Sequence, residues 1–281
     1  MSAGNCGTAR VRQNVPVRKL LAGLIAALTA VVVGAVAADF GVAIYAEYRL
    51  ARSVRTAAHL SFDPWASILS FPFVTQAANH RYKEVEIRAA GVDHPVTGKV
   101  SLEATMHRVD LHDSSWLIGP GAVLPVGKLE SRIIIDSRHI GNVMGIKDLQ
   151  IEAPPRESND ASDNTTESGI SSGNGLVFTG TPTAAGFDKR VSVSVDLTLD
   201  GPNQSTLVLT PTGVLTGPGT ADQTVPQDRS AAVLQAFTSR VPGQKLPFGL
   251  APTSAGVRGS DVIVEGITEG VTITLDGFRQ S

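Results

Sequence analysis

The chain has 281 residues, with 24 Lys and Arg against 26 Asp and Glu, and a formal net charge of −2 at pH 7. This length suffices for one domain with a sizeable core or for two small ones. The four cations of residues 1–38 are not matched by any acid there, so the remainder carries 20 basic and 26 acidic side chains, net −6. An acidic body is a poor partner for polyanions, which excludes nucleic-acid binding.

The first predicted element is an apolar run, Leu20–Ala38, of 19 residues without a charge. As a helix it is about 28 Å long, close to the hydrocarbon thickness of a bilayer. Basic residues precede it and acids follow it, which predicts a cytoplasmic tail over 1–19 and export of residues 39–281 to the periplasmic side of the inner membrane. The length favours a retained anchor, while Ala35-Val36-Ala37 is a possible signal cleavage site. Cys6 lies before the run, so the exported part has no thiol and no disulfide.

Residues 39–60 continue as an amphipathic helix. One face carries Ala43, Ala46, Leu50, Val54 and Ala57, and the other carries Arg49, Arg52 and Arg55. The basic face has two interpretations, a contact with lipid phosphates and an ordinary solvated side of the helix. The pattern favours the second.

From about residue 66 the hydrophobic period becomes two, which predicts strands. The strands are expected at Lys83–Ala90, Lys99–Leu111, Leu129–Ile135, Lys147–Ala153, Arg190–Asp200, Thr206–Leu209, Val262–Glu265 and Val271–Leu275. A slip of phase in the second of them predicts a β-bulge near His107–Arg108. Short helices are expected at about Val74–Asn79, Ser137–Met144 and Ser230–Arg240. The fold class is therefore α+β, with a long helix and a long-stranded, strongly curved antiparallel sheet.

Residues 154–175 are almost free of apolar side chains and rich in Ser, Asn, Asp, Gly and Pro. Such a segment does not bury enough surface to offset its ordering entropy, so a disordered loop is expected there. Strand-type sequence resumes on both sides, and the prediction is therefore one exported domain, 39–281, with a loop inserted into it.

Catalytic and metal-binding patterns are weak. Gly169–Gly173 matches the G-x-S-x-G elbow of hydrolases, but it lies in the polar segment and no histidine follows His139 in the chain. His107 and His112, with Asp110 and Asp113, are the nearest approach to a metal cluster, and an odd spacing places the two rings on opposite faces of a regular strand. We therefore expect no enzyme activity, no metal and no cofactor.

The bulky apolar residues are the remaining candidates for a binding surface. Most of them are expected in the core, and Trp116-Leu117-Ile118 stands out because polar residues and a Gly-Pro-Gly segment flank it as in an exposed loop tip. The candidates for lipid or membrane contact are Trp65, Phe71, Phe73, Trp116, Leu117, Ile118, Phe237 and Phe248.

Two segments carry a family resemblance. The F-P-F-x-T-Q block at Phe71–Gln76 is followed by R-Y-x-E-V at Arg81–Val85, and L-P-F-G-L stands at Leu246–Leu250. With the strands between them, these blocks resemble the actinobacterial LmeA-type phospholipid-binding family over roughly residues 45–277. The segment 154–175 departs from the family pattern.

The resemblance implies a tubular lipid-binding fold, in which a long helix is cradled by a curved sheet around an apolar cavity. It also implies binding of phospholipid of the phosphatidylinositol type, without catalysis, in the maturation of lipomannan-type envelope glycolipids. Each buried CH₂ contributes about 0.8 kcal/mol, so half an acyl chain suffices for several kcal/mol. Arg81 and Lys83, beside the F-P-F block, are the candidates for reading the phosphate.

Two other functions remain open at this point. One is a membrane-tethered scaffold that holds enzymes of envelope glycan biosynthesis as its partners. The other is a lipid-modifying hydrolase or transferase, for which the sequence offers no base close to a nucleophile.

Overall fold

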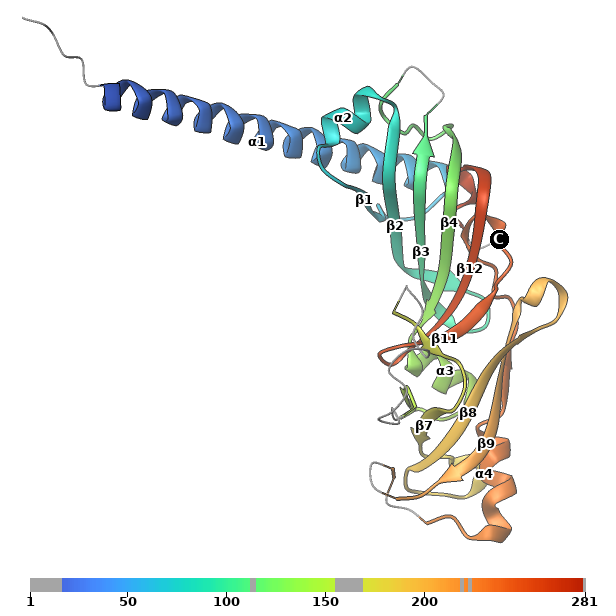
Figure 1. Cartoon of the computed structure of the whole chain (residues 1–281). Helices are drawn as coiled ribbons and strands as arrows, with labels where there is room; N and C mark the ends of the chain where they lie inside the picture. The colour runs from blue at the N-terminus through green and yellow to red at the C-terminus, as the bar shows by residue number, and fades with distance from the viewer. Residues whose placement is uncertain (1–16, 112–114, 155–168, 218–219, 222–223, 280–281) are drawn as a thin grey trace, which may run out of the picture.

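The computed structural model of the chain describes residues 17–111, 115–154, 169–217, 220–221 and 224–279. It is an α+β structure with one long N-terminal helix and two antiparallel sheets (Figure 1). The class and the long helix were predicted from the sequence. The single, strongly curved sheet was a wrong prediction, because five of the strands between residues 150 and 241 form a second sheet of their own, and no strongly curled sheet is found in the described residues.

The first sheet, called sheet A, has seven strands, and the second, sheet B, has five. In spatial order sheet A consists of β1 (Trp65–Leu69), β2 (Arg81–His94), β3 (Gly98–Asp110), β4 (Val123–Ile135), β12 (Asp261–Thr274), β11 (Ser254–Arg258) and β6 (Ser171–Ser172). Sheet B consists of β10 (Ser239–Val241), β9 (Thr206–Leu215), β8 (Val191–Asp200), β7 (Leu176–Gly180) and β5 (Gln150–Glu152). The helices are α1 (Val17–Ala57), α2 (Phe73–Ala78), α3 (Ser137–Met144) and α4 (Ser230–Ala236).

Helix α1 has two halves with different surroundings. Its N-terminal half projects from the body (Figure 1), and it is the one helix in the described part of the chain that is long and apolar enough to cross a membrane. Its C-terminal half contacts β1 on one side and the turn after β12 on the other, so it crosses the apolar face of sheet A. Ala46, Leu50 and Val54 are buried there, as the amphipathic pattern predicted.

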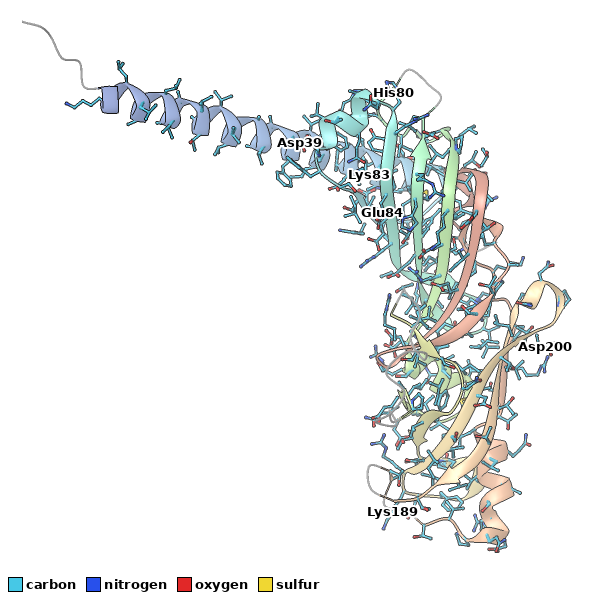
Figure 2. The ribbon with its side chains drawn as sticks, viewed as in Figure 1. Asp39, His80, Lys83, Glu84, Lys189 and Asp200 are labelled. Atoms are coloured by element: carbon cyan, nitrogen blue, oxygen red, sulfur yellow. The ribbon has the colours of Figure 1, made fainter. Side chains whose placement is uncertain are left out.

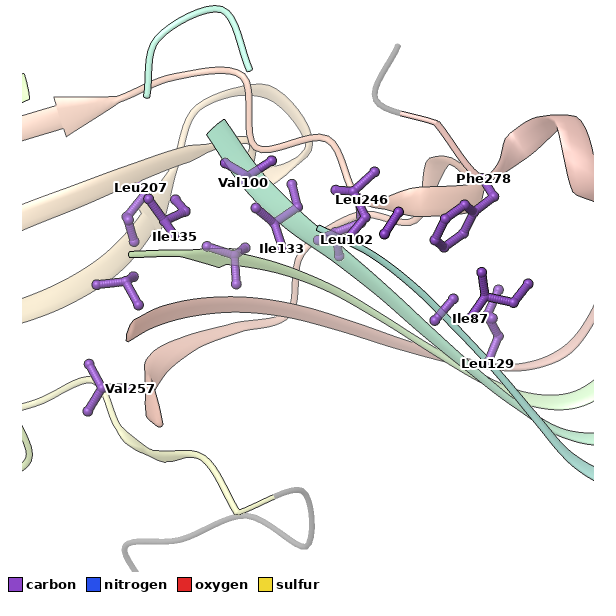
Figure 3. Close-up of a cluster of buried hydrophobic side chains, with 14 of the residues drawn as sticks. Ile87, Val100, Leu102, Leu129, Ile133, Ile135, Leu207, Leu246, Val257 and Phe278 are labelled. Atoms are coloured by element: carbon purple, nitrogen blue, oxygen red, sulfur yellow. The ribbon is translucent and has the colours of Figure 1, made fainter. Parts of the chain in front are cut away.

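The core continues from sheet A into sheet B (Figure 3). Leu102, Leu129 and Ile133 of sheet A and Leu207 of sheet B are all fully buried members of one cluster. The sheets are also joined by backbone, since Leu197 N–H of β8 donates to Gly173 O at 2.7 Å, next to β6. Alternating side chains, one face apolar and one polar, account for the long strands of sheet A.

The phase slip near His107–Arg108 has another cause than the expected bulge. Register between β2 and β3 is continuous there, and the only shift between these strands falls between Ala89 and Val92. The buried positions instead step by three residues in three neighbouring strands, from Tyr82 to Val85, from Met106 to Val109 and from Val126 to Leu129. The backbone of Arg108 has a positive φ of 55°, and its side chain lies over Gly127, where a Cβ would be 2.3 Å from Arg108 Nε. The strands therefore kink together, and the bulge was a wrong prediction.

Two other predicted elements differ from the structure. The strands expected at 262–265 and 271–275 are parts of one strand, β12, which contains Gly266 and Gly270 between its apolar stretches. Of the expected loop 154–175, residues 155–168 lie outside the described residues, and Ser171–Ser172 form β6 by pairing with β11.

Candidate functional site

The candidate site lies where α1 meets the rest of the body, and its framework begins with Asp39. Phe73 N–H and Val74 N–H, the first amides of α2, donate to Asp39 Oδ2 and Oδ1 at 2.9 and 2.8 Å. Pro72, the residue before α2, contributes no side-chain cap of its own. The carboxylate of a different helix therefore satisfies the free amides that every helix start leaves unpaired.

A second carboxylate fastens the same stretch of α1 to sheet A. Glu47 Oε1 accepts hydrogen bonds from Ser67 Oγ at 2.8 Å and from Ile68 N–H at 2.9 Å, both on β1. The rings of Phe40 and Phe71 stack with centroids 6.1 Å apart. Helix α1 is thus tied to α2 and to β1 immediately after its apolar run ends, and Asp39 stands at that point (Figure 2).

An open groove of about 670 Å³ lies beside α2, at the start of β2 and the end of β3. Its lining residues are Thr75, Gln76, Asn79, His80, Arg81, Lys83, Asp110 and Leu111. Buried Gln76 holds its shape, since Gln76 Nε2 donates to Ser70 O at 2.7 Å and Gln76 Oε1 accepts from Lys83 N–H at 2.9 Å. The volume lies within the range of small-molecule sites.

Two cations face this groove with different partners. Arg81 Nε lies 2.8 Å from Asp110 Oδ1 in a solvent-accessible ion pair. Lys83 is exposed, and within the described residues its ammonium has no ion-pair partner. An arginine fork and a nearby lysine are the side chains that bind phosphate best. Among the described residues the groove therefore carries two cations and one carboxylate, and the unpaired positive charge is suited to a phosphate.

A smaller apolar recess of about 230 Å³ adjoins the groove, because Leu111 lines both. The other residues of the recess are Ser115, Leu117, Gly119, Gly121, Ala122 and Val123. It is too small for a whole acyl chain and suits a few carbon atoms beside the phosphate. The two hollows together offer a polar seat next to an apolar one.

The interior between α1 and sheet A is filled with side chains. Leu50, Val54, Ile87 and Met106 are buried to 1% exposure or less. The groove beside α2 and the hollows lined by Arg52 and by Ile170 are open at the surface. This interior is therefore packed, and the groove beside α2 is open to the surface.

The predicted loop tip at 116–118 turns toward the body. Tyr82 OH donates to Trp116 O, and the Trp116 ring packs edge-on against Phe73 with centroids 6.1 Å apart. Burial raises the pKa of Tyr82 to about 12, so its hydroxyl stays a donor. Trp116 and Leu117 are half-buried and Ile118 is buried.

The other apolar candidates are spread over the molecule. Trp65 at the start of β1 and Phe71 just before α2 are exposed. The Arg88 guanidinium lies over the Trp65 ring, with Cζ 4.9 Å from the ring centroid. Phe73 is buried at the start of α2, Phe237 is buried at the end of α4, and Phe248 is half-buried against Phe278. Lipid contact by these residues stays a prediction.

Sequence reasoning singled out Arg81 and Lys83 but not the rest of the groove. Asp110 and Leu111 lie 27 or more residues away, and only the register, with Arg81 opposite Asp110, brings them in. Gln76, Asn79 and His80 stand in or directly after the F-P-F-x-T-Q block, so the motif itself was the signal for them.

The other chemical patterns do not form a site in the described residues. Ser171 of the G-x-S-x-G match lies in β6, paired with β11, and not on a strand-to-helix turn. No group of three or more His, Cys, Asp or Glu side chains suited to a metal is found within the ranges described, and His112 and Asp113 lie outside them. His107 contacts Glu84 at 3.8 Å and Glu130 at 3.5 Å on the polar face of sheet A.

Comparison with known proteins gave one match. The sequence model of a family described as LmeA-like phospholipid-binding matches residues 37–267, which begins where the apolar run ends. Neither the curated proteins nor the solved structures contain a match.

Proposed function

The chain belongs to the LmeA-like phospholipid-binding family, and we propose that it binds one membrane phospholipid by its phosphate in the α2–β2 groove. It performs no reaction on that lipid in this proposal. The observation that carries the proposal is a groove with Arg81 and Lys83, joined through Leu111 to an apolar recess.

The order of these parts matches the order of a phospholipid. A phosphate between Arg81 and Lys83 gains charge-assisted hydrogen bonds of about 1.5–3 kcal/mol each. The first carbons of a chain then meet Leu111 and Leu117 in the recess. Each buried CH₂ adds about 0.8 kcal/mol, so the apolar part supplies affinity and the cations supply selection for phosphate.

We place the body on the periplasmic side of the inner membrane, with α1 crossing the bilayer or serving as a signal segment. The support is the apolar, unburied N-terminal half of α1 and the cations before it. Arg18 and Lys19 precede the run, and Asp39 is the first acid after it, which is the orientation of the positive-inside rule.

The tubular state is proposed for the lipid-loaded protein. Helix α1 lies on sheet A through Leu50 and Val54, and its other contacts are made by small side chains, among them Ala43, Ala46, Ala51 and Ala57. Small side chains at a contact leave little to interdigitate, so a modest outward shift of this half of α1 opens an apolar channel for the acyl chains.

The finer role follows the family resemblance. We propose that the lipid is of the phosphatidylinositol type and that the protein presents it to partner enzymes of lipomannan-type glycan maturation. An inositol ring adds hydroxyl groups, for which Asn79, Thr75 and Asp110 of the groove are hydrogen-bonding partners.

Native mass spectrometry of the full chain, released from detergent micelles that contain phosphatidylinositol, tests this proposal. We expect one bound phospholipid, and the double variant Arg81→Ala/Lys83→Ala to weaken binding at least about tenfold, since one charge-assisted hydrogen bond is worth that factor. Lys189→Ala is the matched control, because Lys189 is an exposed lysine far from the groove (Figure 2).

Three results would contradict the proposal. They are an absence of phospholipid from the wild-type protein, a double variant that binds as wild type does, and a control variant that loses lipid equally. If cross-linking instead finds stable enzyme partners and no lipid, the scaffold function replaces this one.

A further inference from the structure

An exposed apolar surface lies on the tip of the body, next to the groove but outside it. It consists of Phe40 on α1, Phe71 before α2 and Val74 in the first turn of α2, which are 56%, 57% and 50% exposed. The stacked rings of Phe40 and Phe71 make the surface continuous. We call these three residues the docking face.

The position of the docking face along α1 is fixed by hydrogen bonds. Asp39 directly follows the run Leu20–Ala38 and holds the first amides of α2. A helical run of this length fills the hydrocarbon thickness of about 30 Å, so the residue after it stands in the interfacial layer. Phe40 follows Asp39 directly, and Phe71 stacks on it, so the whole docking face lies at that level.

The apolar and charged groups around the docking face follow the same order as the acyl chains and phosphates of a bilayer. Asp39, the acid in its midst, is buried with both oxygens accepting hydrogen bonds, so it presents no exposed negative charge. The cations Arg81 and Lys83 line the groove beside α2, and Figure 2 shows Lys83 on the side of Asp39 that faces away from the apolar run. An apolar tip followed by cations meets acyl chains first and phosphates second.

We propose that Phe40, Phe71 and Val74 insert into the interfacial layer of the bilayer that α1 crosses, and so hold the groove mouth at the level of the lipid phosphates. The occupant is a lipid surface because the docking face continues the apolar surface of α1 without a gap in the helix. The inference rests on the part of the proposed function that places α1 in a membrane. It gives the groove a route for lipid that does not pass through water.

The test uses the full chain with Cys6→Ser, so that a single introduced cysteine carries an environment-sensitive NBD fluorophore. Label sites are Phe71→Cys and Val74→Cys, with Ala232→Cys on α4 as the control, since it is exposed on the far sheet. The labelled proteins are reconstituted into phosphatidylcholine vesicles with and without lipids that carry a doxyl quencher at carbon 5 of the chain.

Blue-shifted emission at positions 71 and 74 that the doxyl lipids quench several-fold, with neither effect at 232, is the expected result. Emission typical of water at both positions would overturn the proposal. A blue shift that the lipids do not quench would also overturn it, because a second copy of the chain then covers the face.

This outcome is separable from the proposed function. Phospholipid binding in micelles, measured by mass spectrometry, depends on Arg81 and Lys83 and does not need the docking face. A chain that binds lipid in micelles but shows water-exposed labels refutes the docking face alone. The reverse result refutes the groove alone.

Discussion

Removal of the Asp39 carboxylate is the sharpest test of how the candidate site is built. Asp39→Ala deletes both acceptors for the first amides of α2. Phe73 is buried, so its N–H is left without a partner and without water, which costs about 1–3 kcal/mol. Val74 is half exposed, and water replaces the carboxylate there at little cost.

The total follows from these two amides. Loss of a helix cap alone costs about 1 kcal/mol, and the buried amide of Phe73 raises the sum to about 2–3 kcal/mol. Because α2 has only six residues, part of the loss is expected as local opening of α2 and not as global unfolding.

The assay combines two measurements on the full chain in detergent. Denaturant unfolding gives the free energy, and hydrogen exchange of residues 71–79 gives local opening. Asp39→Asn is the matched variant, because its amide keeps one acceptor oxygen and has nearly the same volume. We expect it to recover at least half of the loss. An Asp39→Ala protein within about 0.5 kcal/mol of wild type, with unchanged exchange over 71–79, would refute the reasoning.

Three further predictions concern the body. Burial lowers the pKa of His94, and the hydrogen bond to Gly243 O offsets this only in part. Just below pH 6.5 the unfolded state therefore takes up a proton that the folded state does not, so stability falls as the pH drops. Thermal melts of a His94→Gln protein should show less of this fall. Gly256→Ala places a Cβ 2.1 Å from Ser171 O, so we expect the free energy of unfolding to fall by about 1–3 kcal/mol and the amides of β6 to exchange hydrogen faster. In Gly119→Ala the Cβ meets open space, so thermal melts of this control should match wild type. Glu265→Ala removes a carboxylate that neutralises the buried guanidinium of Arg132, so we expect denaturant unfolding to show a loss of about 3 kcal/mol in stability. An unchanged unfolding midpoint would show that the ion pair contributes no net stability.

That last pair belongs to a row of charges on the polar face of sheet A. Arg132 Nε lies 2.5 Å from Glu265 Oε2, and Arg132 also pairs with Glu130. Burial lowers the pKa of Arg132, but the hydrogen bond and charge of Glu265, together with Glu130, raise it above its usual value. Burial likewise raises the pKa of Glu130, while Lys128, Arg132 and His107 bring it below its usual value. These shifts keep Glu130 and Arg132 ionised on that face.

Local pattern predicted the parts of this fold that depend on one segment only. The amphipathic stretch after Asp39 is helical and buries Leu50 and Val54, because a 3.6-residue period has one physical solution there. Long strands followed from alternation for the same reason. What alternation cannot show is which strands pair, since an apolar face is equally well buried in one sheet or in two.

The misread phase slip shows the same limit at a finer scale. A single strand that changes face near Arg108 predicts an extra residue, and no neighbour is visible to show otherwise. The structure shows that the strands beside it change face at the same level, so pairing is preserved. Only the register reveals that the change is shared by three neighbouring strands.

The candidate site divides in the same way. Arg81 and Lys83 lie beside a motif and were found from sequence, while Asp110 enters through register and Leu111 through its N–H, which donates to His80 O. Trp116 was predicted at a loop tip from its polar flanks. The hydrogen bond from Tyr82 to its carbonyl, which turns the segment inward, joins residues 34 apart and has no local signal.

The continuous helix bears on whether this protein carries lipid or presents it. Helix α1 runs unbroken from Val17 to Ala57, and Leu50 in its second half is part of the core. Between Ala38 and Leu50 the rise is about 18 Å, so a chain that keeps its apolar run has no flexible tether with which to leave the surface. The groove of such a protein stays within reach of one leaflet, which favours presenting lipid to a neighbouring enzyme. Cleavage after Ala37 instead leaves Asp39, Glu47 and the docking face in place, and converts the same body into a free carrier whose membrane contact is Phe40, Phe71 and Val74.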